Sequence, residues 1–183
     1  MMLKKRGIAP VIATVLLVLL TITAVSILAA FIVPFVRDNL QKSTQCVSYR
    51  EYFSFEGSFG YNCFDNQGRN AVSVKSNTAS GMVSEKVDGF DLVFIGGGEG
   101  KKVSIRNGQS ACEGSTRFLG MPACPDSAIL QVPEPGEIMT FIYQAGNKTY
   151  SDVEIYPVLK TGTICEKTDS IKIIPCKPEV SLQ

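Results

Sequence analysis

The feature that most constrains this chain is an uncharged apolar run close to its N-terminus. Residues 8–36 include no charged side chain over 29 positions, and Lys4, Lys5 and Arg6 stand directly before them. About 20 apolar residues of helix cross a hydrocarbon core about 30 Å thick, so the run is long enough to span a bilayer. Basic residues beside a span favour the cytoplasmic side. We therefore expect a single-pass protein of the cell membrane, with residues 45–183 outside the cell.

Three interpretations of this N-terminal segment compete. A cleaved secretory signal would use the small residues at Ala24-Val25-Ser26, although the apolar run continues beyond that point. A plain anchor would stay uncleaved. A cut between Gly7 and Ile8 would instead remove only a short leader and leave the whole apolar helix on the mature chain.

A resemblance favours the third interpretation. Residues 5–13 read Lys-Arg-Gly-Ile-Ala-Pro-Val-Ile-Ala, which resembles the class III signal peptide of archaeal type IV pilins. In that family a membrane peptidase cuts after the glycine that follows the basic pair, and the apolar helix becomes the core of a filament. Bacterial type IV pilins carry Glu at the fifth mature position, where this chain has Ile12. The resemblance covers about the first 36 of the 183 residues.

The resemblance implies partners as well as a cleavage site. Lys5, Arg6, Gly7 and Ile8 would be the determinants of leader cleavage. The expected partners are the membrane, a prepilin peptidase, a pilus assembly machinery and identical or related pilin subunits.

Small residues within the apolar run suggest how such helices would pack. Ala9 and Ala13, and likewise Ser26 and Ala30, lie four positions apart and share a helix face. Small faces let helix backbones approach closely in lipid, although small residues are also common in any membrane helix. Pro34 cannot bond to the Ala30 carbonyl, so we expect it to kink the helix near the outer surface.

Composition argues against several classes of function. The chain has 18 basic and 17 acidic residues, a net charge of +1, which gives no electrostatic footprint for nucleic acid. It contains no His, the commonest general base and metal ligand. Asp65, Asp88, Asp91 and Asp126 lack the spacing of a calcium loop and suit turns and caps. We therefore expect no enzyme, no metal and no cofactor.

Six cysteines lie beyond the apolar run. An even number in an exported domain predicts disulfides, with free buried thiols as the alternative. Six cysteines allow fifteen pairings. The least demanding joins sequence neighbours: Cys46 with Cys63, Cys112 with Cys124, and Cys165 with Cys176.

The pattern after residue 45 is that of a β domain. Short alternating segments end at Gly, Pro and Asn turns, at the spacing of a sandwich. The predicted strands cover residues 47–55, 71–75, 91–95, 102–105, 128–132, 137–144, 149–159 and 170–176. The fold class is thus a long N-terminal hydrophobic α-helix followed by an all-β, β-sandwich-like domain, α+β overall. The predicted division is a leader at 1–7, a helix and linker at 8–44, and an external disulfide-linked β domain at 45–183.

Two hairpins follow from turn chemistry. The first pairs residues 90–95 with 102–106, and the second pairs 137–144 with 149–156 across a four-residue turn. Residues 107–127 lack strand character and should form a surface loop.

Three local motifs need separate interpretation. The glycine-rich residues 96–101 fail the phosphate-loop spacing, because Ile95 and Lys102 stand where Gly and a hydroxyl are required. Asn147 opens the sequon Asn-Lys-Thr on a predicted exposed turn, where glycosylation is feasible. The seven aromatic residues between positions 49 and 64 suit either an adhesive face or core packing, and we favour the core.

The sequence therefore predicts a structural subunit of an archaeal type IV pilus-like surface filament, serving adhesion or surface contact. Leader cleavage would precede assembly through the N-terminal helix, and the assembled form would stand on the cell surface. The alternative is a monomeric membrane-anchored extracellular binding protein.

Overall fold

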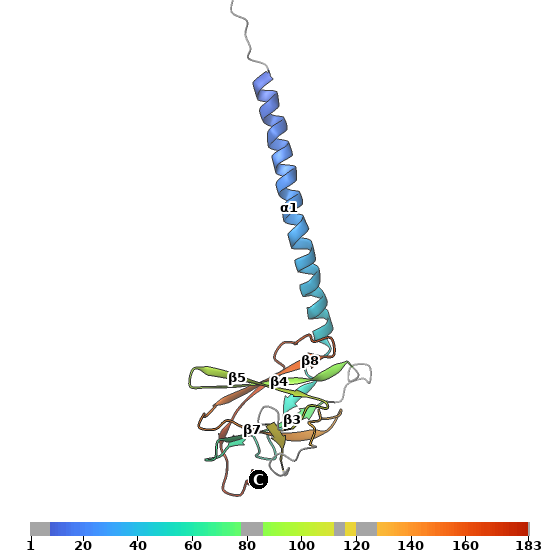
Figure 1. Ribbon diagram of the computed structural model, residues 1–183. Coiled ribbons are helices and arrows are strands. Elements are labelled where there is room, and N and C mark those ends of the chain that lie inside the picture. Colours follow the sequence, from blue (N-terminus) through green and yellow to red (C-terminus); the bar gives the residue numbers. More distant parts are fainter. Residues whose placement is uncertain (1–7, 78–85, 112–115, 120–127, 183) are drawn as a thin grey trace, which may run out of the picture. The chain divides into compact units, whose positions relative to one another are not determined.

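The computed structural model describes residues 8–77, 86–111, 116–119 and 128–182. The chain divides between Ser43 and Thr44 into two compact units. The first consists of most of helix α1 (Ile8–Val47), drawn as one continuous coil in Figure 1. Leu, Val, Ile and Ala dominate its first 29 residues, and the polar residues 37–45 continue it.

Helix α1 has the length and composition of a membrane span. Residues Val11–Val47 reach a mean hydropathy of 2.8 over the most apolar stretch, and among the described residues this is the one helix able to cross a bilayer. Thr14, Thr21 and Thr23 donate hydrogen bonds to the carbonyl three residues earlier at 2.8–2.9 Å. Their hydroxyls are therefore satisfied without water or a neighbouring helix.

The described residues of the second unit include ten strands. They are β1 (Phe53–Phe55), β2 (Cys63–Phe64), β3 (Arg69–Ser76), β4 (Val87–Gly96), β5 (Glu99–Arg106), β6 (Thr116–Phe118), β7 (Ile138–Gln144), β8 (Asp152–Leu159), β9 (Asp169–Lys172) and β10 (Ile174–Pro175).

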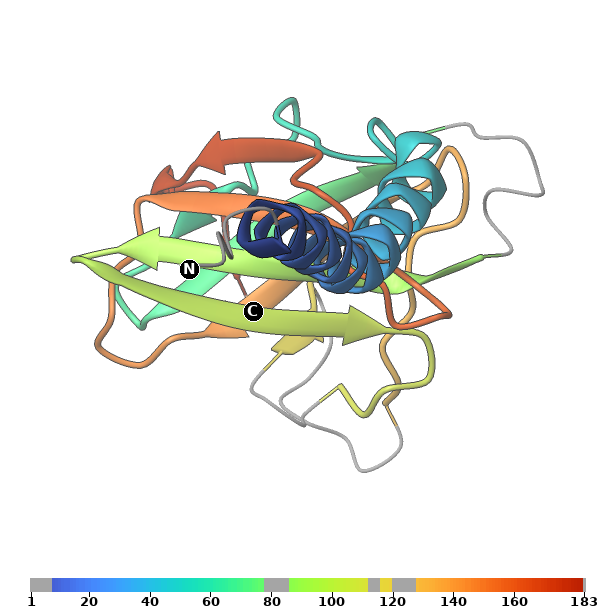
Figure 2. The same cartoon turned by 90° about the horizontal axis from the view of Figure 1, so that it is seen from above.

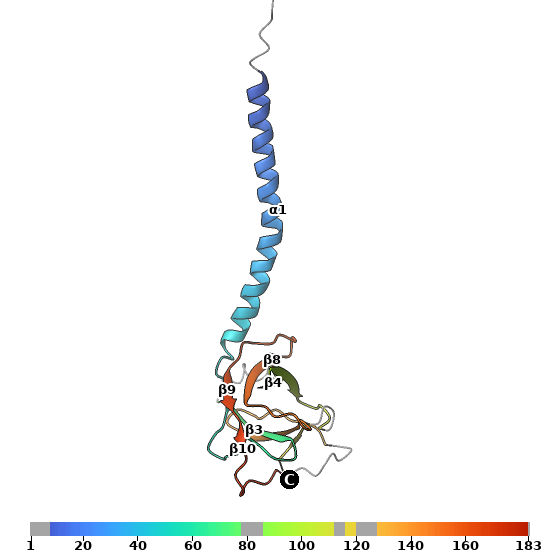
Figure 3. The ribbon, with the colours of Figure 1, turned by 90° about the vertical axis from the view of Figure 1, so that its left-hand side faces the viewer.

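The strands form two sheets. Sheet A has the order β10-β2-β3-β7-β6, with β1 also paired to β3, and sheet B has the order β5-β4-β8-β9. All pairings are antiparallel except that of β10 with β2. Figure 3 shows β4 and β8 in one layer and β3 in the other. Figure 2 shows β4 and β5 as long adjacent strands.

The two sheets share one hydrophobic core. Alternation along each strand sends every second side chain to the buried face. The Phe90 ring of sheet B lies 5.4 Å from the Phe141 ring of sheet A, in an edge-to-face arrangement that aromatic pairs favour. The core side chains that are 0–1% exposed include Phe53, Val72, Val74, Phe90, Leu92, Phe94, Ile105, Phe141, Val153 and Ile155.

The predicted fold class is confirmed: a long apolar helix precedes a β domain of two sheets. The first predicted hairpin is also confirmed, since β4 and β5 pair from Gly89–Arg106 to Gly96–Glu99. The second hairpin is wrong. β7 belongs to sheet A and β8 to sheet B, so the turn at residues 145–148 carries the chain from one sheet to the other.

Other strand predictions need correction. Residues 47–52 end the helix and form a turn, and only 53–55 are a strand. Residues 128–132 form no strand; Leu130 is buried and Ile129 makes an isolated bridge with Ser110. Residues 107–127, predicted as a loop, include β6 at their centre.

The sequential disulfide pairing is wrong. Cys46 bonds to Cys165 and Cys63 to Cys176, across sequence separations of 119 and 113 residues. The second bond follows from topology, because β10 returns beside β2 and places Ile174 opposite Cys63. Cys112 and Cys124 lie outside the described residues.

The C-terminal segment covers part of the outer face of sheet A. Leu182 is 1% exposed and packs with Ala71 and Ile142, with Val180 and Cys176 beside them. Its carbonyl accepts a hydrogen bond from the Arg117 guanidinium at 3.1 Å. The end of the chain is thus an integral part of the domain.

Candidate functional site: the apolar helix and the two-turn groove

The first candidate site is the surface of α1. Every described side chain from residue 11 to residue 40 is exposed, including Ala13, Ser26 and Ala30. The Ser26 hydroxyl donates a hydrogen bond to the Ile22 carbonyl at 2.8 Å, which leaves a small, internally satisfied surface. An apolar surface of this length requires lipid or other protein around it.

The remaining predicted residues of the segment are less fully described. Lys5, Arg6 and Gly7 lie outside the described residues. Ile8 and Ala9 fall in the first turn of α1. The helix continues through Pro34, and the kink there stays a prediction.

A second candidate site lies on the β domain, where two turns distant in sequence touch. The first turn, residues 65–68, joins β2 to β3, and the second, residues 145–149, lies in the connection between β7 and β8. The Ala145 N–H donates to the Gly68 carbonyl at 2.8 Å. A Cβ on Gly68 would lie 1.8 Å from the Gly146 carbonyl oxygen, so only glycine permits this contact.

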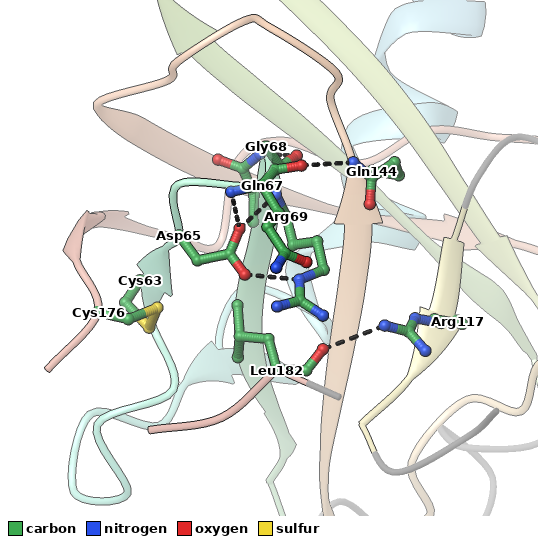
Figure 4. A network of polar contacts seen from close by, with 10 residues as sticks. Cys63, Asp65, Gln67, Gly68, Arg69, Arg117, Gln144, Cys176 and Leu182 are labelled. Atoms are coloured by element: carbon green, nitrogen blue, oxygen red, sulfur yellow. Dashed lines mark hydrogen bonds and ion pairs between the residues drawn. A yellow bond between two sulfur atoms is a disulfide. The ribbon is translucent and has the colours of Figure 1, made fainter. Parts of the chain in front are cut away.

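Asp65 fixes the first turn (Figure 4). Its Oδ1 accepts the backbone N–H groups of Gln67 at 2.8 Å and Arg69 at 3.0 Å, and its Oδ2 pairs with the Arg69 Nε at 2.5 Å. Gln144 then joins the two sides by donating from Nε2 to the Gln67 carbonyl at 2.8 Å. Burial acts to raise the pKa of Asp65, but the hydrogen bonds from Arg69 and Gln67 outweigh it and lower that pKa.

Between the turns lies an open cavity of about 600 Å³, the two-turn groove. It is lined by residues 64–68 and 70 on one side and by 144 and 146–149 on the other. Asn147, the sequon residue, is exposed in its wall. Lys148 pairs with Glu99 of the β4–β5 hairpin, which raises the pKa of Lys148 and lowers that of Glu99.

No protein-family model matches this chain, and no curated protein matches its sequence.

The aromatic cluster belongs mainly to the core, as we favoured. Tyr49, Tyr52 and Phe53 are 0–5% exposed, and Tyr52 meets Phe53 edge to face at 4.7 Å. Phe55 and Phe64 pack partly against the same core. Phe59 differs, because 55% of it is exposed.

Sequence reasoning missed two polar features. Asp91 was assigned to turns and caps, but it lies within β4, is 1% exposed and pairs with the Arg106 guanidinium at 2.6 Å. Arg106 lies on the paired strand β5, diagonally across from Asp91. Opposite charges on neighbouring strands attract, so this arginine was the sequence signal for a buried ion pair. The two-turn groove gave no local signal, because its sides come from segments about 80 residues apart.

Proposed function

We propose that this protein is a structural subunit of a surface filament of the archaeal type IV pilus kind. Helix α1 supplies the filament core by packing against copies of itself. The β domain covers the outside. The single observation that carries the proposal is an apolar helix, exposed from residue 11 to residue 40, that follows a Lys-Arg-Gly sequence.

The physical case rests on what can surround α1. Its exposed residues include large side chains such as Leu20 at 69% and Phe31 at 73%, and water is an unfavourable neighbour for them. Lipid can cover them before assembly and other helices can cover them afterwards. Because lipid and a helical core are similarly apolar, transfer between them needs close packing as its driving force. Ala13, Ser26 and Ala30 supply positions for that packing.

The disulfides support an extracellular place for the β domain. Such bonds persist in oxidising surroundings and are rare in the cytosol. They attach the last turn of α1 at Cys46, and strand β2 at Cys63, to the C-terminal quarter of the chain. A domain that stands on a cell surface gains stability against unfolding from such covalent links.

The mature N-terminus tests the proposal. Mass spectrometry of the protein from its native membrane should find Ile8 as the first residue. Gly7→Val should yield a protein heavier by the seven-residue leader, because a bulky residue at the cut blocks the peptidase. An intact N-terminus in the wild type, or normal cleavage of Gly7→Val, would contradict the filament proposal.

The two-turn groove favours a second candidate, a monomeric membrane-anchored binding protein. In that case α1 is an anchor only, and the β domain presents the groove to a ligand. An uncleaved N-terminus together with the absence of filaments under all growth conditions would support this candidate.

A further inference from the structure

The side chains that line the two-turn groove are mostly neutral and polar. Four of them are exposed: Asn66, Gln67, Asn147 and Thr149. Within the described part of the chain, the side chains of these four residues make no hydrogen bond. Amides present donors and acceptors side by side, and a hydroxyl does both. The groove therefore offers several amide groups and a hydroxyl with unused bonding capacity.

Its charged groups are already neutralised. Asp65 and Lys148 are the charged residues of the lining. Both oxygens of Asp65 accept bonds, from the Gln67 N–H and from Arg69, and Lys148 pairs with Glu99 outside the lining. An ionic ligand would have to break one of these pairs. A neutral ligand would not.

Hydrogen bonds hold the two sides of the groove together. The backbone contact of Gly68 with Ala145 and the bond from Gln144 to Gln67 join its two sides. Preorganised polar groups bind better because less freedom is lost on binding. Half-buried Phe64 adds an apolar surface, and Asn70, 1% exposed, carries an Oδ1 that accepts no bond within the described chain.

We propose that the two-turn groove is a binding site for a neutral saccharide, with side-chain amides bonding to sugar hydroxyls. A volume of about 600 Å³ lies inside the ~300–1,000 Å³ range of small-molecule sites. Because Phe64 is the one large apolar side chain of a mostly polar lining, the groove suits a hydroxyl-rich ligand better than an apolar one. The inference goes beyond filament assembly, because the whole groove lies within the β domain.

The saccharide can come from two sources. One is a sugar of another surface or of the medium. The other is a glycan on Asn147 itself, whose attachment forms a bond from Nδ2 to the anomeric carbon. A lipid-phosphate-linked saccharide is the donor in that step; its phosphate leaves with the bonding electrons, and Nδ2 loses a proton.

The first arm of the test uses full-length unmodified protein in a zwitterionic detergent without a sugar headgroup. Maltose and lactose are the neutral probes and sialyllactose is the anionic one. Side-chain amide signals of Asn66 and Gln144 are followed by NMR during titration, with Gln45 in the last turn of α1 as the internal control. A neutral probe should shift the groove signals at millimolar concentration, and the Gln45 signal should stay fixed.

Variants connect the signal to the groove. Asn66→Ala should weaken binding roughly three- to tenfold, the effect of one or two lost hydrogen bonds. Its side chain has no partner in the described chain, so folding should be unaffected. Gln45→Ala removes an exposed amide elsewhere and should leave affinity unchanged. Equal affinity in Asn66→Ala and wild type, or preference for sialyllactose, would overturn the proposal.

The second arm uses protein from its native cells, compared with Asn147→Gln. A glycan seated in the groove should shift the Asn66 signal relative to Asn147→Gln and should block added maltose. If neither added sugar nor attached glycan moves the groove amides, the proposal is wrong. The NMR signals are measured on unassembled chains, so a failure of sugar binding leaves the filament proposal standing. Intact filaments of Asn66→Ala would show that assembly does not depend on sugar binding by the groove.

Discussion

At the residue scale, single positions decide whether the two turns of the groove can meet. Gly68 has a φ of +74°, and Gly146, whose carbonyl it approaches, has a φ of +66°. Both conformations are strained for residues with a Cβ. Asp65 adds the hydrogen bonds that keep the first turn in place. The geometry of the groove thus depends on two glycines and one carboxylate.

Gly68→Ala should destabilise the β domain by ~2–4 kcal/mol, through left-handed strain and collision with the Gly146 carbonyl. Urea unfolding of the full chain in detergent measures this. Gly57→Ala is the matched control, because a Cβ there meets nothing within 4 Å and no left-handed φ is required. A control that loses as much stability as Gly68→Ala would show that the contact is unimportant.

Because the pKa of Asp65 is lowered in the folded protein, the free energy of unfolding should depend on pH. The contribution of this carboxylate is complete above the unfolded pKa of about 3.9 and is lost as the pH falls through the lower native pKa. Asp65→Asn should therefore be less stable than wild type by ~1–2 kcal/mol at pH 7, and this difference should shrink as the pH falls below about 3.9. Unfolding curves at pH 7 and at a series of acidic pH values measure the difference. Asp38→Asn is the control, and it should leave unfolding of the β domain unchanged because Asp38 lies outside that domain.

At the element scale, local elements were predictable and long-range partnerships were not. The β4–β5 hairpin has its turn, alternation and glycines within 18 residues, so local reasoning found it. The turn at 145–148 has the same chemistry, yet Ala145 bonds to Gly68 and Ser151 bonds to Ile95 in the other sheet. Alternation says which side chains face the core and does not say which sheet a strand joins.

The same limit explains the other corrections. Leu130 is buried, and its backbone bonds to Gln109 and Gly108, but these bonds extend into no ladder. Its apolar segment therefore imitated a strand. Sequential disulfides close the shortest loops, which made them the simplest prediction. The observed pairs depend on where β10 lies, and that is decided by the whole sheet.

We predict that close packing between copies of helix α1 depends on Ala13. Ala13→Phe adds bulk without polarity, so insertion into the membrane should survive while close helix packing fails. We expect processed protein in the membrane and at least a tenfold loss of surface filaments in electron micrographs. Leu17→Phe changes a position on the same face that already has a large side chain, and it should assemble. Normal filaments from Ala13→Phe would refute the contact at this face.

At the scale of the whole molecule, the disulfides close nearly the entire β domain into covalent loops. Cys46 and Cys63 stand at its beginning, and their partners Cys165 and Cys176 stand near its end. A loop of more than 100 residues strongly restricts the unfolded chain. The first bond should stabilise the folded state by about 4.7 kcal/mol, and the second should add less because the two loops overlap.

Cystine mapping without reductant should recover linked peptides of these two pairs.

The pairing also predicts how the protein responds to tension, which a filament subunit would experience through α1. Force from the helix enters the domain at Cys46. From there to Asn147 the backbone runs 101 residues, but through the disulfide to Cys165 only 18 residues remain. At about 3.5 Å per residue, full extension is then limited to ~60 Å, compared with ~350 Å after reduction.

Single-molecule stretching tests this directly. One handle is attached to the N-terminal end of α1 and the other to an azide-bearing residue placed at exposed position 147. Unfolding of the β domain should release ~60 Å or less in the oxidised chain and up to ~160 Å in Cys165→Ser. In that variant the shortest covalent path runs from Cys46 to Cys63, across the second disulfide, and from Cys176 back to position 147. Cys63→Ser is the matched control: it removes the other disulfide and leaves the short path through Cys165 intact, so its extension should equal that of the wild type. Equal extensions in the Cys165→Ser and Cys63→Ser variants would contradict the pairing and its mechanical consequence together.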